Sequence, residues 1–352
     1  MLYRQLTLKD IAKELNTSVS TVSRALKDHH SISDEMKKKV KELAVKWDYH
    51  PNPIAVSLLK NKSYTIGVVV PEIAHNYFSI VLDGIEDAAI SAGYNVMFCL
   101  SKEILKREIN VINTLLNNRI DGFIIAPTKE TITYEHLDSI VNKGIPLIFI
   151  DRYCEEVYAS RVVVDDYNGA FKAVEHLIST GRKRIAHIAG PETLSNSRLR
   201  LSGYLDALKK FNIQPEDELI VHCDLTKASA RESMNKIIGL ARLPDGILAY
   251  NSSIAFEGML VVKEKGLKIP DQIAFVGFAN EPIISYIEPQ LTTVIQPAYQ
   301  IGQEAVRLFL DQQANEDYAA TPKTRILNTQ LVIRGSSVKT KSVHPSPITQ
   351  TG

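Results

Sequence analysis

Residues 18–26 carry the first set of side chains that could do chemistry. The segment reads SVSTVSRAL and combines small hydroxyl side chains with one guanidinium. If a helix starts at Ser18, its inward stripe consists of Val22, Ala25 and Leu26. The hydroxyls and the arginine are then left outside, where they suit hydrogen bonds to the base edges and phosphates of DNA. Taken alone, the segment fits the solvated face of a structural helix bundle equally well.

A second set of polar and aromatic side chains follows strand-like segments further along the chain. Its carboxylate, guanidinium, amide and ring groups fall at residues 75–78, Asp151, Arg152, residues 197–200, Asn251 and residues 278–281. Ligands of open α/β sheets bind beyond the carboxyl ends of the strands. These groups suit a polyhydroxylated ligand, held by bidentate hydrogen bonds and ring stacking. The alternative for each residue is an interdomain salt bridge or a helix cap.

Three short helices are predicted to position the first set. Apolar residues recur with helical spacing over residues 8–15, and Thr7 with Asp10 forms a capping box in front of them. A third helix begins after Ser33, has two acidic residues in its first turn and extends to Trp47. Three helices in about 45 residues form a minimal core.

A further short helix is predicted after these three. Asn52 is a good N-cap, and Pro53 occupies the first helical position, where its missing N–H costs nothing. A helix from Pro53 to about Leu59 is too short to be stable alone. We expect it to form only with a partner.

From Tyr64 onward, apolar strand-like runs alternate with amphipathic helical stretches. The runs cover residues 64–70, 94–100, 121–127, 146–151, 161–165, 184–190, 218–223, 245–250 and 273–278. Such runs separated by helices indicate parallel sheets covered on both faces. Nine units exceed one comfortable sheet, so we predict an α/β body of two doubly wound subdomains.

Charge is distributed unevenly along the 352 residues. Residues 1–63 hold 12 Lys and Arg against 7 Asp and Glu, whereas the rest hold 29 against 33. A basic unit joined to a mildly acidic body predicts a polyanionic partner at the first end. No apolar run is long enough for a bilayer and the first residues lack a secretory pattern, so a cytoplasmic protein without a membrane partner is expected.

Two other classes of protein fit the sequence less well. An enzyme is disfavoured because GxGxxG, GxxxxGK[ST], HExxH and GxSxG are all missing from the sequence. A transport-binding protein is disfavoured by the missing export signal and the basic first unit. Cys99, Cys154 and Cys223 are far apart and form no metal-binding pattern, so neither a metal nor a cofactor is expected.

Residues 6–58, LTLKDIAKELNTSVSTVSRALKDHHSISDEMKKKVKELAVKWDYHPNPIAVSL, resemble the helix-turn-helix headpiece and hinge of the LacI/GalR family of bacterial transcription regulators. Family-like motifs continue in GRKRIAHIAGP, RLRLSGY and PQLTTVIQP, so the resemblance runs from about Leu6 to Gly335. It implies a body similar to periplasmic sugar-binding proteins, with two subdomains joined by three crossovers around a ligand cleft.

The resemblance also implies which residues contact DNA. Val19 and Ser20 fall where the family reads sequence in the major groove, and Leu58 matches the residue that hinge helices of a dimer insert into the minor groove. The DNA-binding residues implied in this way are Thr7, Leu8, Asn16, Ser18, Val19, Ser20, Thr21, Ser23, Arg24, Tyr49, Asn52, Ala55 and Leu58.

The same resemblance places an effector site in the cleft. The residues implied for it are Tyr77, Phe78, Asp151, Arg152, Arg198, Arg200, Asn251 and Asn280. Ser252, Ala279 and Leu225 depart from the family pattern, which has two aspartates and an aromatic residue there. Either Asn280 or Glu281 is expected to take over one hydroxyl contact.

We therefore predict a sequence-specific transcription regulator, a repressor, that binds a pseudo-palindromic DNA operator as a homodimer. A small sugar-like effector bound between the body subdomains is expected to control operator affinity allosterically. The alternative is a cytoplasmic α/β sugar-binding protein or enzyme without a DNA-binding role. The chain is expected to act in the bacterial cytoplasm at the nucleoid.

The predicted domain boundaries follow from these segments. The predicted parts are a headpiece at 1–50, a hinge at 51–63, a body at 64–338 and a disordered tail at 339–352. Within the body, the first subdomain is predicted at 64–162 and 295–323, and the second at 163–294 and 324–338.

Overall fold

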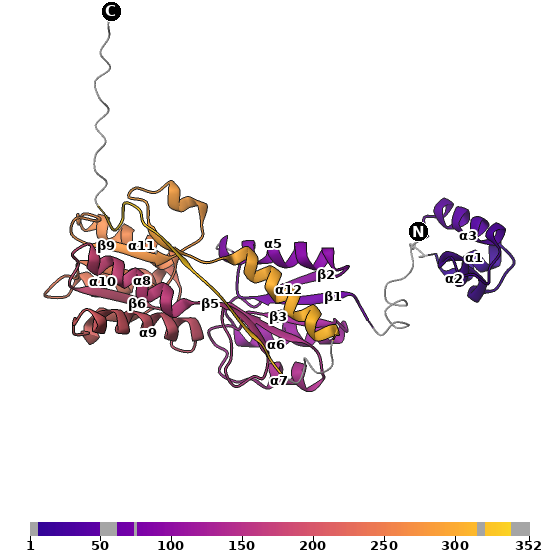
Figure 1. The fold of residues 1–352 in the computed structure, drawn as a ribbon, viewed down its shortest axis with the longest axis horizontal. Coiled ribbons are helices and arrows are strands. Elements are labelled where there is room, and N and C mark those ends of the chain that lie inside the picture. Colours follow the sequence, from indigo (N-terminus) through magenta and orange to yellow (C-terminus); the bar gives the residue numbers. More distant parts are fainter. Residues whose placement is uncertain (1–5, 50–61, 74–75, 315–320, 339–352) are drawn as a thin grey trace, which may run out of the picture. The chain divides into compact units, whose positions relative to one another are not determined.

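The computed structural model of the chain describes residues 6–49, 62–73, 76–314 and 321–338 (Figure 1). The chain divides into two compact units, Met1–Tyr64 and Thr65–Gly352. The predicted hinge helix from Pro53 and the predicted tail at 339–352 lie outside the described residues. Every helix in the described ranges is too short or too polar to span a lipid bilayer.

The first unit contains the three predicted helices. They are α1 (Leu8–Glu14), α2 (Val19–Leu26) and α3 (Asp34–Lys46). Thr7 and Asp10 form the reciprocal bonds of a capping box before α1, and the hydroxyls of Ser18 and Ser33 cap α2 and α3. The small core that holds the helices together consists of Ile11, Ala12, Val22, Ala25, Val40 and Ala44.

The second unit, which we call the body, contains two six-stranded sheets. The first sheet has the order β11-β5-β4-β3-β1-β2, and all of its pairs are parallel. Its strands are β1 (Thr65–Val70), β2 (Asn95–Leu100), β3 (Gly122–Ile125), β4 (Leu147–Ile150), β5 (Ser160–Val164) and β11 (Thr324–Leu327).

Helices cover both faces of this first sheet. They are α5 (Asn76–Ser91), α6 (Leu105–Asn117), α7 (Glu135–Asn142) and α12 (Ala298–Ala314). Alternate residues of β1 point to opposite faces, so Val68 packs with α5 and α12 whereas Val69 packs with α6 and α7. Figure 1 shows α5 and α12 side by side on one face.

The second sheet has the order β12-β10-β9-β8-β6-β7. Its strands are β6 (Ile185–Ala189), β7 (Ile220–His222), β8 (Gly246–Ala249), β9 (Ala274–Phe278), β10 (Thr292–Ile295) and β12 (Gln330–Val332). It is parallel except for the pair of β10 with β12. The helices that cover it are α8 (Asp166–Ser179), α9 (Ser195–Lys210), α10 (Lys227–Ile238) and α11 (Ser252–Glu264), and two short 3-10 turns lie at Asp217–Leu219 and Pro282–Ser285.

The prediction of two doubly wound subdomains is confirmed, and all nine predicted strand segments form strands. The chain crosses between the sheets three times, after β5, after β10 and between β11 and β12. The predicted subdomain limits were wrong in three places. In the largest error, residues 324–327 were assigned to the second subdomain. Those residues form β11, which pairs with β5 in the first sheet. Smaller errors place 163–164 and residue 295 in the wrong sheet, since β5 ends at Val164 and β10 at Ile295.

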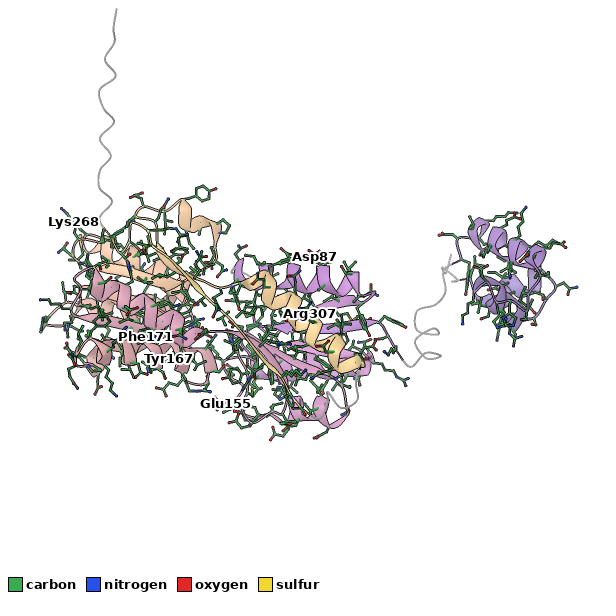
Figure 2. The ribbon with its side chains drawn as sticks, in the orientation of Figure 1. Asp87, Glu155, Tyr167, Phe171, Lys268 and Arg307 are labelled. Atoms are coloured by element: carbon green, nitrogen blue, oxygen red, sulfur yellow. The ribbon has the colours of Figure 1, made fainter. Side chains whose placement is uncertain are left out.

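Two glycines allow α5 and α12 to pack very closely. A Cβ added at Gly84 would lie 2.1 Å from the Tyr299 carbonyl oxygen, and one added at Gly302 would lie 2.2 Å from the Val81 carbonyl oxygen. The Tyr299 hydroxyl also donates to Asp87, which is labelled in Figure 2, at 2.7 Å. The two helices are about two hundred residues apart in the sequence. Their close packing therefore joins distant parts of the chain in the first subdomain.

Candidate functional site

Helix α2 presents an exposed polar face from the first unit. Val22 and Ala25 are fully buried in the three-helix core. Val19 is 39% exposed, and Ser20 and Arg24 are also exposed. Within the described ranges, no carboxylate pairs with the Arg24 guanidinium.

Some of the predicted DNA-binding side chains have structural partners of their own. The Thr7 hydroxyl donates to Asp10 at 2.8 Å, and the Ser18 hydroxyl caps α2 by accepting from the Thr21 N–H at 3.0 Å. Leu8 and Tyr49 are half-buried and pack against the core. These partners leave only the exposed parts of the four side chains for any further contact, and their DNA-binding role stays a prediction.

The remaining predicted DNA-binding residues fall into two groups. Thr21 and Ser23 are half-buried on α2, and Asn16 is exposed in the turn before it. Asn16 has a φ of 46°, a backbone conformation that asparagine tolerates better than most residues. The other group, which lies outside the described residues, consists of Asn52, Ala55 and Leu58.

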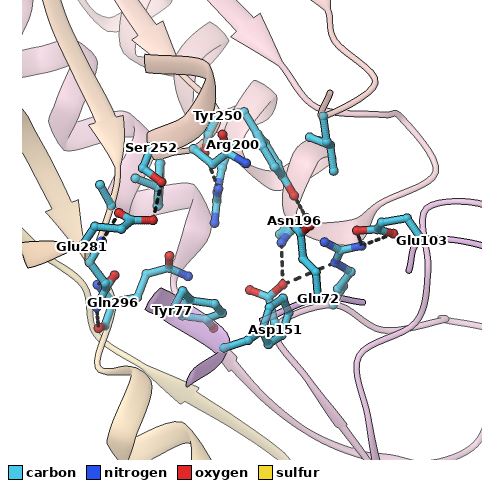
Figure 3. A pocket seen from close by; sticks show the side chains of 17 residues that line it. Glu72, Tyr77, Glu103, Asp151, Asn196, Arg200, Tyr250, Ser252, Glu281 and Gln296 are labelled. Atoms are coloured by element: carbon cyan, nitrogen blue, oxygen red, sulfur yellow. Dashed lines mark hydrogen bonds and ion pairs between the residues drawn. The ribbon is translucent and has the colours of Figure 1, made fainter. Parts of the chain in front are cut away.

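The body contains a pocket where the carboxyl ends of strands from the two sheets face each other (Figure 3). Its volume, with its open mouth, is about 590 Å³. Seven of the eight residues predicted for the effector line it, namely Tyr77, Phe78, Asp151, Arg152, Arg200, Asn251 and Asn280. Their binding role stays a prediction, but the structure brings them together.

Arg198 was predicted to line this pocket, and that placement is wrong. Its guanidinium faces outward, donates to the carbonyl oxygens of Glu192 and Thr193 at 3.0 Å, and pairs with Glu155 at 3.0 Å. The reason is helix geometry, because residues two apart on α9 lie on nearly opposite faces and Arg200 occupies the inner one.

Arg200 is held rigidly at the floor of the pocket. Its guanidinium lies 2.7 Å from the Asp166 carboxylate, donates to the Tyr250 carbonyl oxygen at 2.5 Å and covers the Phe278 ring at 3.7 Å. Arg200 and Asp166 are both buried. Burial raises the pKa of Asp166 to about 7, and the positive charge of Arg200 opposes this rise.

Asp151 and Arg152 form a second network on the other side of the pocket. Arg152 donates to Glu103 at 2.9 Å, and its Nε lies 3.4 Å from Asp151. Burial, the largest single influence, lowers the pKa of the Arg152 guanidinium, but Glu103, Tyr250 and Asp151 together outweigh it and the pKa is raised. The Asn196 amide donates to Asp151 at 3.4 Å and accepts from the Tyr250 hydroxyl at 2.8 Å, so this network joins the two subdomains.

Glu281 and Ser252 form the third polar group of the pocket. The Ser252 hydroxyl donates to one Glu281 oxygen at 2.5 Å, and the Asn280 N–H donates to the other at 3.1 Å. The Asn280 amide bonds to the backbone of Gln296 in both directions, at 2.6 and 3.2 Å. Between the two residues expected to take over a hydroxyl contact, the structure therefore favours Glu281.

Two buried donors in the pocket have no hydrogen-bond partner. They are the Tyr77 hydroxyl and the Gln296 Nε2. Burial raises the pKa of Tyr77 well above its ordinary value, and the nearby charge of Asp151 adds to the rise, although the two form no hydrogen bond of normal geometry. A buried unpaired donor is costly, so both groups suit a ligand that offers acceptors.

Asn251 also acts as the N-cap of α11, since its side-chain oxygen accepts from the Ile254 N–H at 3.0 Å. The structural alternative raised for this residue is therefore correct, and the amide nitrogen together with the second lone pair of the oxygen is left for a ligand.

The sequence reasoning missed five lining residues, which are Glu72, Glu103, Asn196, Tyr250 and Gln296. Four of them, Glu72, Glu103, Tyr250 and Gln296, follow β1, β2, β8 and β10, so the strand-end rule could have found them. Asn196 lies in the first turn of α9, at the same sheet edge.

The subdomains also touch at the mouth of the pocket. Lys129 donates to the Asp224 carbonyl oxygen at 2.6 Å, and the Thr193 hydroxyl donates to the Lys129 carbonyl oxygen at 2.8 Å. The Tyr153 N–H donates to the Ser195 hydroxyl at 3.1 Å. These three bonds would break if the subdomains moved apart.

Two family models match the chain, one within each of the two compact units. Residues 7–52 match the family described as "Bacterial regulatory proteins, lacI family". Residues 174–337 match the family described as "Periplasmic binding protein-like domain".

Individual relatives match most of the chain. The HTH-type transcriptional repressor CytR of Escherichia coli strain K12 is 30% identical over 331 residues, which are 94% of this chain and 96% of that repressor. A lac repressor dimer bound to operator and the anti-inducer ONPF is 25% identical and covers 95% of this chain and 100% of its own, with a TM-score of 0.83. A LacI family transcriptional regulator from Enterococcus faecium with bound ribose is 27% identical, covers 79% and 100%, and gives a TM-score of 0.68.

Proposed function

This chain belongs to the lacI family of bacterial regulatory proteins, and we propose that α2 reads an operator under the control of an effector held in the body pocket. The chain is a DNA-binding transcription regulator, a repressor, rather than an enzyme. The observation that carries the proposal is that α2 buries one stripe in a small core and leaves Val19, Ser20 and Arg24 exposed.

The contacts follow from the chemistry of each side chain. Val19 and Ser20 would face base edges, where a methyl group meets thymine and a hydroxyl meets donors or acceptors. Arg24 would meet a guanine edge or a phosphate. The predicted contacts that support them are Thr7, Leu8, Asn16, Ser18, Thr21, Ser23, Tyr49, Asn52, Ala55 and Leu58.

The pocket would hold a small sugar-like effector between the subdomains. Asp151 and Asn196 lie on opposite subdomains and are bonded across the pocket, so a ligand that touches both would favour one arrangement of the subdomains. The relative from E. faecium binds ribose, which supports a sugar-like ligand. Arg200, Arg152, Tyr77 and Asn251 would be the other contacts.

Coupling between pocket and operator would pass through a dimer. The matched lac repressor is a dimer on its operator, which supports a pseudo-palindromic operator here. The edge strand β2 leaves Met97 and Phe98 more than two-fifths exposed, and large apolar side chains at a sheet edge suit coverage by a second copy. The parts would be a headpiece at 1–50, a hinge at 51–63, a body at 64–338 and a tail at 339–352.

The site of action would be the bacterial cytoplasm, at the nucleoid. This location follows from the proposed operator, since the DNA target lies there.

The test is an operator selection with the full-length protein. Random duplexes are selected at physiological salt, and the best sequence is measured with and without a panel of sugars. We expect a pseudo-palindromic site bound at least about a thousandfold more tightly than random DNA. A protein that binds all duplexes equally would exclude the proposed function.

A further inference from the structure

We propose that the pocket accepts uncharged or amine-bearing effectors and excludes anionic ones, and that Glu281 sets this preference. The inference rests on the proposed function, because it assigns a charge class to the effector of the same pocket. It concerns Glu281 because the hydrogen bonds that this lining carboxylate accepts come from neutral groups, whereas Glu103 and Asp151 pair with Arg152.

The formal charges of the pocket are the first argument. Four carboxylates line it, those of Glu72, Glu103, Asp151 and Glu281, against the guanidiniums of Arg152 and Arg200. Two negative charges are therefore in excess. In addition, Arg200 is paired with Asp166, a carboxylate outside this count.

The cationic side chains are already paired. Arg200 lies 2.7 Å from buried Asp166, which is not itself a lining residue, and Arg152 is paired with Glu103 and Asp151. An anionic ligand would have to compete with these carboxylates for each guanidinium. Breaking a buried pair leaves an uncompensated charge, which is strongly unfavourable.

Glu281 differs from Glu103 and Asp151, which pair with Arg152, because its own hydrogen-bond partners are neutral. Its two oxygens accept from the Ser252 hydroxyl and the Asn280 N–H, and within the described part of the chain no lysine or arginine pairs with it. Two neutral donors hold the carboxylate in place without cancelling its charge. A ligand hydroxyl or ammonium group would complete its hydrogen bonds, whereas a phosphate or carboxylate would meet a like charge.

Helix N-termini bring some positive charge to the pocket but not enough to reverse its sign. Helices α5, α9 and α11 begin there, and each N-terminus counts as roughly half a positive charge. Together they fall short of the two excess negative charges. In addition, one donor at the start of α11 is already satisfied, because Asn251 caps the Ile254 N–H.

An independent observation shows that the pocket is built for a ligand. The Gln296 side chain is 6% exposed, lines the pocket, and its Nε2 has no hydrogen-bond partner. The Tyr77 hydroxyl is likewise buried and unpaired. The ligand must therefore offer acceptors near these donors and a donor near Glu281, and a polyhydroxylated molecule, with or without an amine, offers both.

The test compares ligands that share a scaffold and differ in charge. Hexoses and pentoses, their 2-amino-2-deoxy forms, and their uronic acid and phosphate forms are each tested by thermal shift at roughly 10 mM, a concentration at which millimolar binders raise the melting temperature. Full-length wild type, Glu281→Gln and Glu281→Lys are compared. Glu264→Gln, an exposed carboxylate at the far end of α11, is the matched control.

For wild type we expect the largest shift from an uncharged or amine-bearing form, bound at least about tenfold more tightly than its acidic counterpart. Glu281→Gln should narrow this ratio and Glu281→Lys should reverse it, with Glu264→Gln unchanged. The proposal is overturned if an acidic form binds wild type best, or if the order of the forms is the same in Glu281→Lys. Thermal melting of the unliganded variants shows whether they fold. If Glu281→Lys does not fold, the ligand preference of Glu281→Gln decides the test.

The two levels of the hypothesis fail in different ways. If no compound changes the melting temperature or the operator affinity of wild type, the effector role of the pocket is excluded, and the charge preference falls with it. If compounds bind and change operator affinity but in the wrong charge order, the charge preference alone is excluded.

Discussion

The Arg200 guanidinium lies 2.7 Å from the Asp166 carboxylate, and both side chains are buried. Asp166 begins α8 directly after the first crossover between the sheets, and Arg200 comes from α9 at the pocket floor. The ion pair thus connects the pocket directly to the first crossover segment, about which the two subdomains would move.

Arg200→Ala should destabilise the body as well as weaken effector binding. It leaves Asp166 buried without its partner, which is expected to lower the free energy of unfolding by about 3 kcal/mol. Arg198→Ala is the control, since its exposed pair with Glu155 should contribute under about 1 kcal/mol. Denaturant melts measure both, and equal stability of the two variants would contradict the buried-pair account.

His187 should make the body less stable in mild acid. Burial lowers the pKa of His187 to about 4, partly opposed by its bond to the Leu248 carbonyl oxygen, against about 6.5 when unfolded. The unfolded chain therefore binds this proton more tightly, so the contribution of His187 to stability falls by about 3 kcal/mol in total as the pH drops from about 6.5 to 4. Asp166, whose pKa burial raises to about 7, acts with the opposite sign in the same range, so the effect of His187 is the difference between wild type and variant.

The measurement is the melting temperature of the body across that pH range. Relative to wild type, His187→Gln should gain stability as the pH falls, whereas His222→Gln, which changes an exposed histidine at the edge of the same sheet, should keep the wild-type slope. A profile of wild-type slope in His187→Gln would rule out this residue as the cause.

Gly302→Ala should disrupt the contact of α5 with α12. The added methyl would lie 2.2 Å from the Val81 carbonyl oxygen and 2.6 Å from the Ile85 nitrogen, so the helices must separate. We expect a loss of about 1–3 kcal/mol, as in overpacked cores. Gln303→Ala, on the exposed side of α12, is the control. If Gly302→Ala is as stable as this control, the helices can separate without a loss of stability.

Val19→Ala and Ser20→Ala should change which operator is bound rather than whether DNA is bound. Each is expected to lower affinity for the selected operator by about 1–3 kcal/mol while leaving non-specific binding and its salt dependence unchanged. Val45→Ala, at a residue that is 82% exposed on α3, is the control. Equal losses on operator and random DNA would assign Val19 and Ser20 to backbone contact instead.

The sequence predicted the fold best where burial decides it. The three headpiece helices and strands β1 to β9 have apolar patterns that can be recognised in the sequence without knowledge of the tertiary structure. Strands β10, β11 and β12 were missed. The side chains of β11 and β12 are largely exposed, so no apolar run marks them, and β10 is a four-residue strand that begins with two threonines. Their pairing depends on neighbours far away in the sequence, which local patterns do not encode.

The pocket was predictable where a residue directly follows a strand. Asp151, Arg152 and Asn251 were found in this way, because a strand end fixes the edge of the sheet. Arg198 was misplaced because a helix at that edge turns only one face inward, and the sequence does not say which. Asn196 was missed for the same reason, and the choice of Glu281 over Asn280 required their hydrogen bonds to be known.

The central claim is that a ligand bound in the body pocket controls the affinity with which α2 binds a specific DNA sequence. The most direct measurement is the affinity of full-length protein for its selected operator and for random duplex, at physiological salt, with and without a compound that raises the melting temperature of the body. We predict a preference of about a thousandfold or more for the operator, and a change of about five- to 150-fold in operator affinity when the compound is added. An operator affinity that does not respond to a compound bound in the pocket, or that does not exceed the affinity for random DNA, would contradict the claim.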